Sequence, residues 1–124
     1  MKIQAGIVDI NGTKYVPADS VQTQKAESVD GMEYVIVRTY SAGVHAGYMK
    51  SRDGKEIVLI KARRLWFWKG AATLSQLAME GVKNPEECKF PCEVDSITLT
   101  EAIEVIPATA AAKESIDGVK IWKK

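Results

Sequence analysis

The sequence has one histidine, His45, and two cysteines, Cys88 and Cys92, among its 124 residues. A structural zinc site usually needs four cysteine or histidine ligands, often in two closely spaced pairs, so we expect no metal site. A serine or cysteine nucleophile would have to use His45 as its base, and the surrounding stretch SAGVHAG has no signature of such a site. Phosphate-loop, dinucleotide and HExxH patterns are also missing. We therefore expect no catalytic residues and no cofactor, with a His45-dependent phosphodiesterase as the least favoured alternative.

Long apolar runs and a strong net charge are missing as well. No run approaches the ~18 apolar residues of a membrane span, and Met1 to Ile10 lacks the pattern of a signal peptide, so we expect a soluble cytoplasmic protein. The net charge of +1 disfavours a partner such as extended DNA or RNA, which normally binds a broad basic surface. The hydrophobic share of 46% and the charged share of 27% are typical of one globular domain.

Residues 1–31 are expected to form an N-terminal β-hairpin and a connector. In GIVDINGTKYVPADSV, alternating apolar residues flank Asn11 and Gly12, a pair that favours a tight hairpin turn. The stretch QTQKAESVDG that follows has no apolar period and is typical of a connector. Residues 32–124 are then a β-rich core, and the whole chain is a single structural domain.

The core pattern predicts strands joined by tight turns, with two short helices inserted. β-branched and aromatic residues are enriched in the strands, Gly81 and Gly118 end the helices, and Thr109 is suited to the N-cap of the second one. The fold class is therefore α+β, a mostly antiparallel β-sheet with two short helices. The predicted strands are 34–40, 44–50, 56–60, 63–68, 89–94 and 96–107, and the predicted helices are 71–80 and 109–116.

The most unusual stretch is KARRLWFWKG, which places four cations and three aromatic residues in nine positions. If this segment is a regular strand, Arg64, Trp66 and Trp68 share one face, and Arg63 and its alternate neighbours share the other. Guanidinium groups grip phosphates and indole rings stack on bases, so the first face could form the wall of a nucleotide pocket. The alternative is structural: such tryptophans are often core or subunit-interface residues, and such arginines often pair with surface carboxylates.

A second stretch, RTYSAGVHAG, adds further candidate phosphate partners. Arg38 and Ser41 offer donors, while Gly43 and Gly47 would let the backbone approach a ligand closely. Gly70 begins the segment that leads to the first predicted helix, whose N-terminus would also favour an anion. A compact ligand with a few phosphates fits this combination better than a long nucleic acid.

RTYSAGVHAG, ARRLWFWKGAA and their flanking residues resemble a family of small proteins of tailed bacteriophages and prophages, over about residues 32 to 124. The chain is further similar to the first Thoeris anti-defence family, phage sponges that sequester bacterial immune signals. The resemblance implies binding of glycocyclic ADP-ribose signals, and in some members cyclic trinucleotides, without cleavage. It also implies a homo-oligomer in which dimers build a hexamer, with pockets at subunit contacts, in the cytoplasm of the infected bacterial host.

The segment IPAT departs from the family pattern, because we expect a cysteine in relatives at the position of Ala108. The alternative to a sponge is a non-enzymatic interaction protein whose tryptophan-rich strand buries an oligomer or partner interface. The ligand-binding residues that we predict are Arg38, Ser41, Ala42, Gly43, Arg63, Arg64, Trp66, Trp68 and Thr109.

Overall fold

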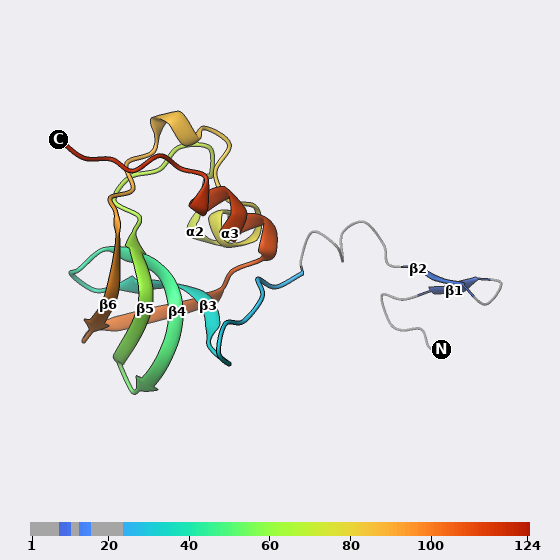
Figure 1. The fold of residues 1–124 in the computed structure, drawn as a ribbon, viewed down its shortest axis with the longest axis horizontal. Coiled ribbons are helices and arrows are strands. Elements are labelled where there is room, and N and C mark those ends of the chain that lie inside the picture. Colours follow the sequence, from blue (N-terminus) through green and yellow to red (C-terminus); the bar gives the residue numbers. More distant parts are fainter. Residues whose placement is uncertain (1–7, 11–12, 16–23) are drawn as a thin grey trace.

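The computed structural model describes residues 8–10, 13–15 and 24–124. It confirms the α+β class: five antiparallel strands form one sheet in the order β6-β5-β4-β3-β7, with two α-helices beside it (Figure 1). A separate antiparallel pair, β1 and β2, is the expected hairpin, and its turn residues 11–12 lie outside the described ranges. The elements are β1 Val8–Ile10, β2 Thr13–Tyr15, β3 Glu33–Thr39, β4 Val44–Asp53, β5 Glu56–Arg64, α2 Leu74–Glu80, the 3-10 turn η1 Pro85–Glu87, β6 Glu93–Leu99, β7 Ala102–Pro107 and α3 Ala110–Asp117.

Both faces of the five-stranded sheet are buried, and the alternation of β3 shows how. Tyr34 and Ile36 pack with the helices in one cluster, whereas Val35 and Val37 pack with residues of β5 in a second cluster. Successive side chains of a strand point to opposite faces, so β3 is apolar at four consecutive positions, 34–37, instead of alternating with polar residues there. The sheet therefore has a core on each side.

The sheet curls so that its two edges approach each other. The evidence is that β6 and β7 lie at opposite edges and yet follow each other in the chain. Only Thr100 and Glu101 connect them, and so short a connection spans no more than about 10 Å. The backbone N–H of Ala102 donates to the carbonyl of Lys55, which brings the start of β7 to the start of β5. The single strand predicted over 96–107 is therefore wrong: the chain turns at residue 100 and crosses from one edge of the sheet to the other.

A β-bulge in β5 decides which arginine faces which side. One residue of β4, Gly47, lies opposite two residues of β5, Lys61 and Ala62, and Lys61 has a positive φ of 52°. A Cβ on Gly47 would lie 3.1 Å from the Cα of Ala62, so Gly47 accommodates the neighbouring strand, not a ligand as we expected. The extra residue shifts the alternation by one. Ala62 consequently enters the core inside the curl, and Arg63 points toward the helices.

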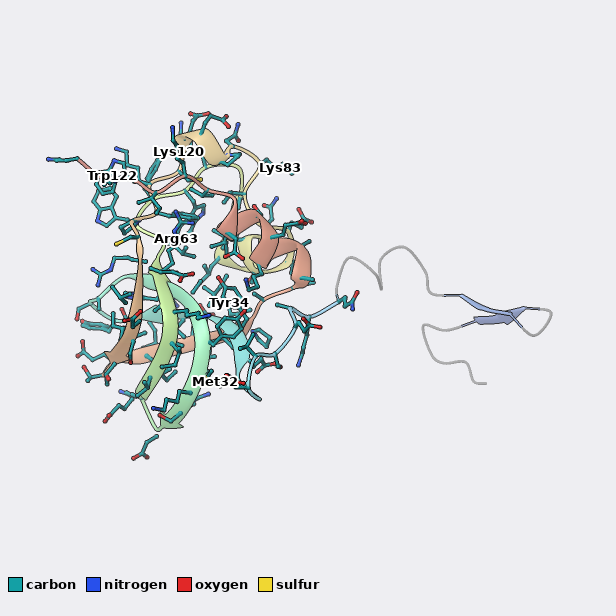
Figure 2. All side chains as sticks on the ribbon, in the orientation of Figure 1. Met32, Tyr34, Arg63, Lys83, Lys120 and Trp122 are labelled. Carbon is teal, nitrogen blue, oxygen red and sulfur yellow. The ribbon has the colours of Figure 1, made fainter. Side chains whose placement is uncertain are left out.

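Arg63, labelled in Figure 2, is only 6% exposed. It donates to four backbone carbonyls. Its Nε donates to Pro91 at 2.9 Å and its Nη2 to Phe90 at 3.1 Å. At the C-terminal end of α3, Nη1 donates to Ile116 and Nη2 donates to Val119, both at 2.7 Å. Carbonyls at a helix C-terminus lack intrahelical partners and carry the negative end of the helix dipole, so a buried cation is favourable there. These bonds commit Arg63 to the fold, and we remove it from the predicted ligand set.

Thr109 is also structural. Its hydroxyl accepts from the N–H of Ala112 at 3.0 Å, which confirms the predicted N-cap of α3, and donates to the carbonyl of Met79 at 2.7 Å in α2. One side chain thus caps one helix and ties it to the other, so Thr109 leaves the ligand set as well. Gly81 ends α2 with a positive φ of 79°, as predicted.

The connector and the fourth predicted strand differ from expectation. In the connector, Lys25 forms a β-bridge with Thr109, and Ala26 is buried among core residues, so residues 24–26 pack against the core domain. β5 ends at Arg64, and residues 65–68 leave the sheet, with Phe67 forming only an isolated bridge to Lys89. The strand predicted over 63–68 is therefore wrong. Among the helices of the described ranges, none has the length and apolar character needed to cross a membrane.

We expect the two adjacent arginines to differ sharply in their effect on stability. Arg63→Met would remove the guanidinium donors of four carbonyls, of which those of Phe90 and Ile116 keep a backbone donor. This loss should lower the free energy of unfolding by about 3 kcal/mol or more. Arg64→Met, at an exposed side chain, should change it by about 0.5 kcal/mol or less. Urea denaturation of both variants measures the difference. Equal losses would show that the buried carbonyl bonds do not hold α3 in place.

Candidate functional site

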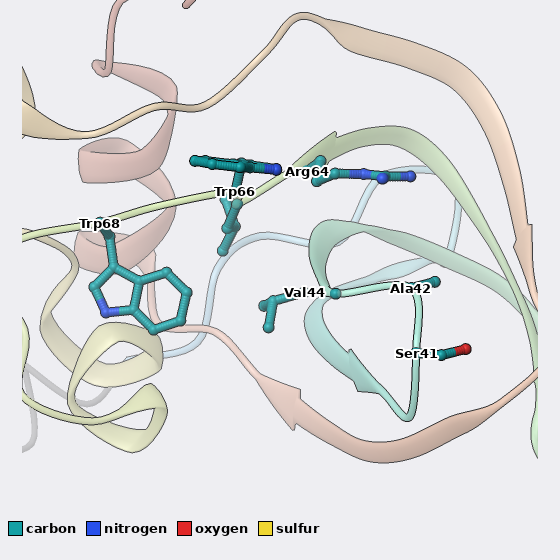
Figure 3. Close-up of a pocket in the computed structure, with 8 residues that line it drawn as sticks. Ser41, Ala42, Val44, Arg64, Trp66 and Trp68 are labelled. Carbon is teal, nitrogen blue, oxygen red and sulfur yellow. The ribbon is translucent and has the colours of Figure 1, made fainter.

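A pocket of about 370 Å³ lies where the β3–β4 turn meets the segment that follows β5 (Figure 3). We name it the tryptophan pocket. It contains most of the predicted ligand set, although residues 65–68 do not form the regular strand from which we placed them. Arg38, Arg63 and Thr109 are not among its lining residues. The residues that line it are Ser41, Ala42, Gly43, Val44, Arg64, Leu65, Trp66 and Trp68.

The turn at residues 41–43 is held in place by the hydrogen bonds of two buried side chains. The Thr39 hydroxyl donates to the Gly43 carbonyl at 2.8 Å and accepts from the N–H of Ala42 at 2.8 Å. His45, 1% exposed, donates from Nε2 to the Ala42 carbonyl at 2.9 Å. Gly43 has a φ of 86° with open space where a Cβ would be, so glycine is favoured there by backbone conformation alone. The turn is thus a pre-formed side of the pocket.

The two side chains that could act as a nucleophile and its base, Ser41 and His45, already form other hydrogen bonds. The Ser41 hydroxyl donates to the Glu101 carboxylate at 2.7 Å, and the His45 ring bonds to a backbone carbonyl. Burial lowers the pKa of His45, and the positive charge of Arg64 lowers it further, against the opposing effect of the Ala42 carbonyl. His45 is therefore neutral near pH 7 and makes no bond to Ser41, so the two do not form a nucleophile and base pair.

Arg64 is the cation of the tryptophan pocket. Of the ion pairs within the described part of the chain, none involves Arg64. By contrast, Arg38 pairs with Glu104 at 2.9 Å and Lys69 pairs with Glu87 at 3.7 Å. Arg38 therefore lies outside the pocket with its charge already partnered. Arg64 is exposed and offers its planar fork of donors to an anion in the pocket.

Two indole rings accompany this guanidinium. Figure 3 shows the Trp66 ring and the Arg64 guanidinium side by side and edge-on, opposite the turn that carries Ala42 and Ser41, with Trp68 at one side. Trp66 is 59% exposed, although a ring of this size is usually buried in a domain without a partner. An exposed ring beside an unpaired guanidinium is an arrangement suited to stacking a planar group next to an anion.

Trp122 supports Trp66 from behind. The two rings stack with centroids 5.5 Å apart and an interplanar angle of 23°, and the Lys89 ammonium lies over both, at 6.0 Å from Trp66 and 5.7 Å from Trp122. One face of Trp66 is therefore covered, and the other remains available to a ligand. The sequence did not predict that Trp122 backs the pocket, because no spacing rule relates it to Trp66, so far away in the chain.

A second cavity, of about 430 Å³, lies between the sheet and α3. Of the three cations that line it, Lys113 and Arg63 are engaged, and the exposed Lys61 has no ion pair among the described residues. Lys113 pairs with Asp117, and its ammonium lies over the rings of Tyr34 and Tyr48 at 5.1 and 5.8 Å. Arg63 also borders this cavity, with its donors on backbone carbonyls. Across the described ranges, no group of three or more His, Cys, Asp or Glu side chains is placed to hold a metal ion. The tryptophan pocket is therefore the stronger candidate site.

Comparison with known proteins yields one family. The model of a domain of unknown function, DUF6948, matches residues 32–116, which is more than half of the chain. No curated protein and no solved structure matches the chain.

We expect Trp122 to set the orientation of Trp66. Stacked indoles couple their electronic transitions, so the wild type should show a paired far-ultraviolet circular dichroism signal that Trp122→Ala abolishes. Trp122→Phe should retain a stacked ring behind Trp66 and preserve ligand affinity better than the alanine variant does. A Trp122→Ala protein with an unchanged spectrum would show that the two rings do not stack in solution.

His45 should make stability depend on pH. Its pKa in the folded protein lies below the ordinary value of about 6.5, so the unfolded chain binds a proton that the folded chain does not. The contribution of His45 to the free energy of unfolding is then fully present above about pH 6.5. It falls as the pH drops below this value, by at most ~1.4 kcal/mol per pH unit. His45→Gln keeps a donor for the Ala42 carbonyl and cannot titrate. Urea denaturation at about pH 7.5 and pH 5.5 should show a smaller loss in the variant, and equal losses would contradict this assignment.

Proposed function

This chain belongs to the DUF6948 family, a domain of unknown function. We propose a function for it from the chemistry of its tryptophan pocket. The protein binds a cyclic nucleotide signal and sequesters it without cleaving it. The observation that carries this proposal is the Arg64 guanidinium, which has no ion pair among the described residues, beside the exposed Trp66 ring in one pocket.

The ligand class follows from these side chains. Arginine recognises phosphate with paired donors, and an indole face accepts any nucleobase by stacking. A volume of about 370 Å³ lies within the usual range of small-molecule sites, ~300 to 1,000 Å³. One cation in the pocket and a chain net charge of +1 suit a compact ligand with few phosphates better than a polynucleotide. A cyclic nucleotide with a few phosphates meets each of these conditions.

Binding without turnover is supported by the state of the polar groups. Hydrolysis of a phosphodiester needs a base that activates the attacking oxygen or a metal that polarises the phosphate. His45 is buried and bonded to a carbonyl, and the Ser41 hydroxyl is paired with a carboxylate. The groups that remain available in the pocket are donors and ring faces, which hold a ligand but do not transfer protons.

A protein that holds a signal intact lowers its free concentration by mass action. The resemblance to the first Thoeris anti-defence family gives this activity a setting: a phage protein in the cytoplasm of an infected bacterium, bound to glycocyclic ADP-ribose or, as in some members of that family, cyclic trinucleotides. The proposal includes assembly as a homo-oligomer, from dimers to a hexamer, because pockets at subunit contacts would enclose such ligands more fully.

A second candidate function is a protein interface, which the exposed apolar residues favour. Trp66, Phe67, Ile121 and Trp122 are between 38% and 59% exposed, and the stack of Trp66 on Trp122 brings two of them together. A cluster of exposed aromatic residues is typical of an oligomer or partner interface. Under this function the tryptophans contact protein, and the pocket holds no nucleotide.

Calorimetric titration with cyclic ADP-ribose and with cyclic mono-, di- and trinucleotides tests the proposal. We expect a saturable site that Arg64→Ala or Trp66→Ala weakens by about 10- to 100-fold, because a charged hydrogen bond or a stacked base contributes ~1 to 3 kcal/mol. Arg38→Ala, which removes an ion-paired arginine outside the pocket, is the matched control and should bind normally.

The fate of the ligand separates the alternatives. After binding, heat denaturation should release the same compound into the supernatant, as chromatography would show. A cleaved product would instead support the phosphodiesterase. If no cyclic nucleotide is retained and Trp66→Ala converts an oligomer to a monomer in gel filtration, the tryptophans serve an interface and the binding proposal is wrong.

A further inference from the structure

Arg64 borders two cavities. Besides the tryptophan pocket, its side chain lines a smaller cavity of about 180 Å³, which we name the Cys92 cavity. In register, Arg64 lies opposite His45, and both side chains border the smaller cavity. Arg64 lines both cavities and is exposed, so its guanidinium lies between them at the protein surface. The residues that line the Cys92 cavity are His45, Ala62, Arg64, Pro91, Cys92, Val94 and Ile97.

The β5 bulge produces this arrangement. Because the extra residue at Lys61 shifts the alternation, Ala62 and Arg64 share a face, and Arg63 lies on the other. Ala62 then lines the Cys92 cavity, and Arg64 lines both that cavity and the pocket that contains Trp66. Without the bulge, Arg63 would occupy this face and Arg64 would point to the helices.

The Cys92 cavity differs from the tryptophan pocket in chemistry. Apart from Arg64 and the His45 ring, its walls are aliphatic or weakly polar, because Pro91, Val94 and Ile97 line it together with Cys92. Among these, Val94 is 45% exposed, an apolar surface that a ligand ring could cover. The volume is several times the ~30 Å³ that one water molecule occupies in the liquid. Such a site suits a flat, weakly polar ring and offers little to a second phosphate or a free sugar.

We propose that the Cys92 cavity is a second subsite that binds the second ring of a ligand with two ring systems joined through phosphate. Arg64 grips the phosphate between the rings, Trp66 stacks on one ring, and Pro91, Val94 and Ile97 cover the other. This inference rests on the proposed function and narrows its ligand class to nucleotides with at least two bases, such as cyclic dinucleotides, in preference to one-base signals such as glycocyclic ADP-ribose.

Two probes separate the subsites by calorimetry. Adenosine monophosphate carries one ring and one phosphate, and cyclic di-adenosine monophosphate carries two rings and two phosphates. The wild type should bind the two-ring probe about 10- to 100-fold more tightly, because covering a second ring with apolar side chains removes its surface from water. Val94→Trp, a change at a half-exposed position, fills the Cys92 cavity and should reduce this advantage to less than threefold. The matched control is Val29→Trp, at a 37% exposed valine that lines neither cavity, and should preserve the advantage.

Cys92 gives an independent readout without a bulky substitution. Cys92 is exposed and Cys88 is buried, so iodoacetamide should alkylate Cys92 first in the folded protein. Saturating two-ring probe should slow this alkylation at least tenfold, whereas saturating one-ring probe should leave it nearly unchanged. Cys92→Ser removes the fast-reacting thiol and shows that the label reports on this position.

The outcomes distinguish this inference from the function on which it rests. If both probes bind with equal affinity and neither protects Cys92, the second subsite is refuted while the tryptophan pocket remains a nucleotide site. If neither probe binds, the proposed function and the subsite both fail. A two-ring advantage that Val94→Trp removes, together with protection of Cys92, establishes the subsite.

Discussion

The fold depends on one buried guanidinium. Arg63 binds the carbonyls of Phe90 and Pro91, before β6, and those of Ile116 and Val119, at the end of α3. A charge of this kind is costly to bury unless its donors are satisfied, and backbone carbonyls satisfy them without a carboxylate. Burying the Arg63 charge is costly unless its donors are satisfied, so the loop before β6 and the end of α3 must both lie beside β5 at this position. The segment after Val119, which carries Trp122 behind the pocket, begins from that point.

The same constraint explains why the neighbouring arginine remains available for binding. With Arg63 fixed toward α3, alternation places Arg64 on the opposite face, where the described residues supply no ion-pair partner. The bulge at Lys61 sets this phase, and Gly47 makes room for it. One strand irregularity thus separates a structural arginine from a ligand-binding candidate. The two arginines have different roles because consecutive side chains of a strand point to opposite faces of the sheet.

Sequence reasoning predicted the fold class, most strand positions, both helices and the grouping of Arg64 with Trp66 and Trp68. These features depend on local patterns: alternation, caps and turn residues. The failures have nonlocal causes. The bulge and the curl of the sheet come from strand pairing, and the role of Arg63 depends on carbonyls 27 to 56 residues away in sequence. Residues 65–68 are not a strand, yet both tryptophans line the same pocket as Arg64.

The energetics of sequestration argue for more contacts than the tryptophan pocket alone provides. A signal present at nanomolar concentration requires a binding free energy of about −12 kcal/mol. One stacked base contributes ~1 to 3 kcal/mol, and one hydrogen bond to a charged group ~1.5 to 3 kcal/mol, before the entropy of association is subtracted. A ring on Trp66 and a phosphate on Arg64 therefore cannot reach nanomolar affinity by themselves. The protein must gain the remainder from a second ring beside Arg64, from a neighbouring subunit or from both. Only ligands large enough to extend beyond the first pocket would then be bound tightly, so the same requirement would exclude the abundant mononucleotides of the cell.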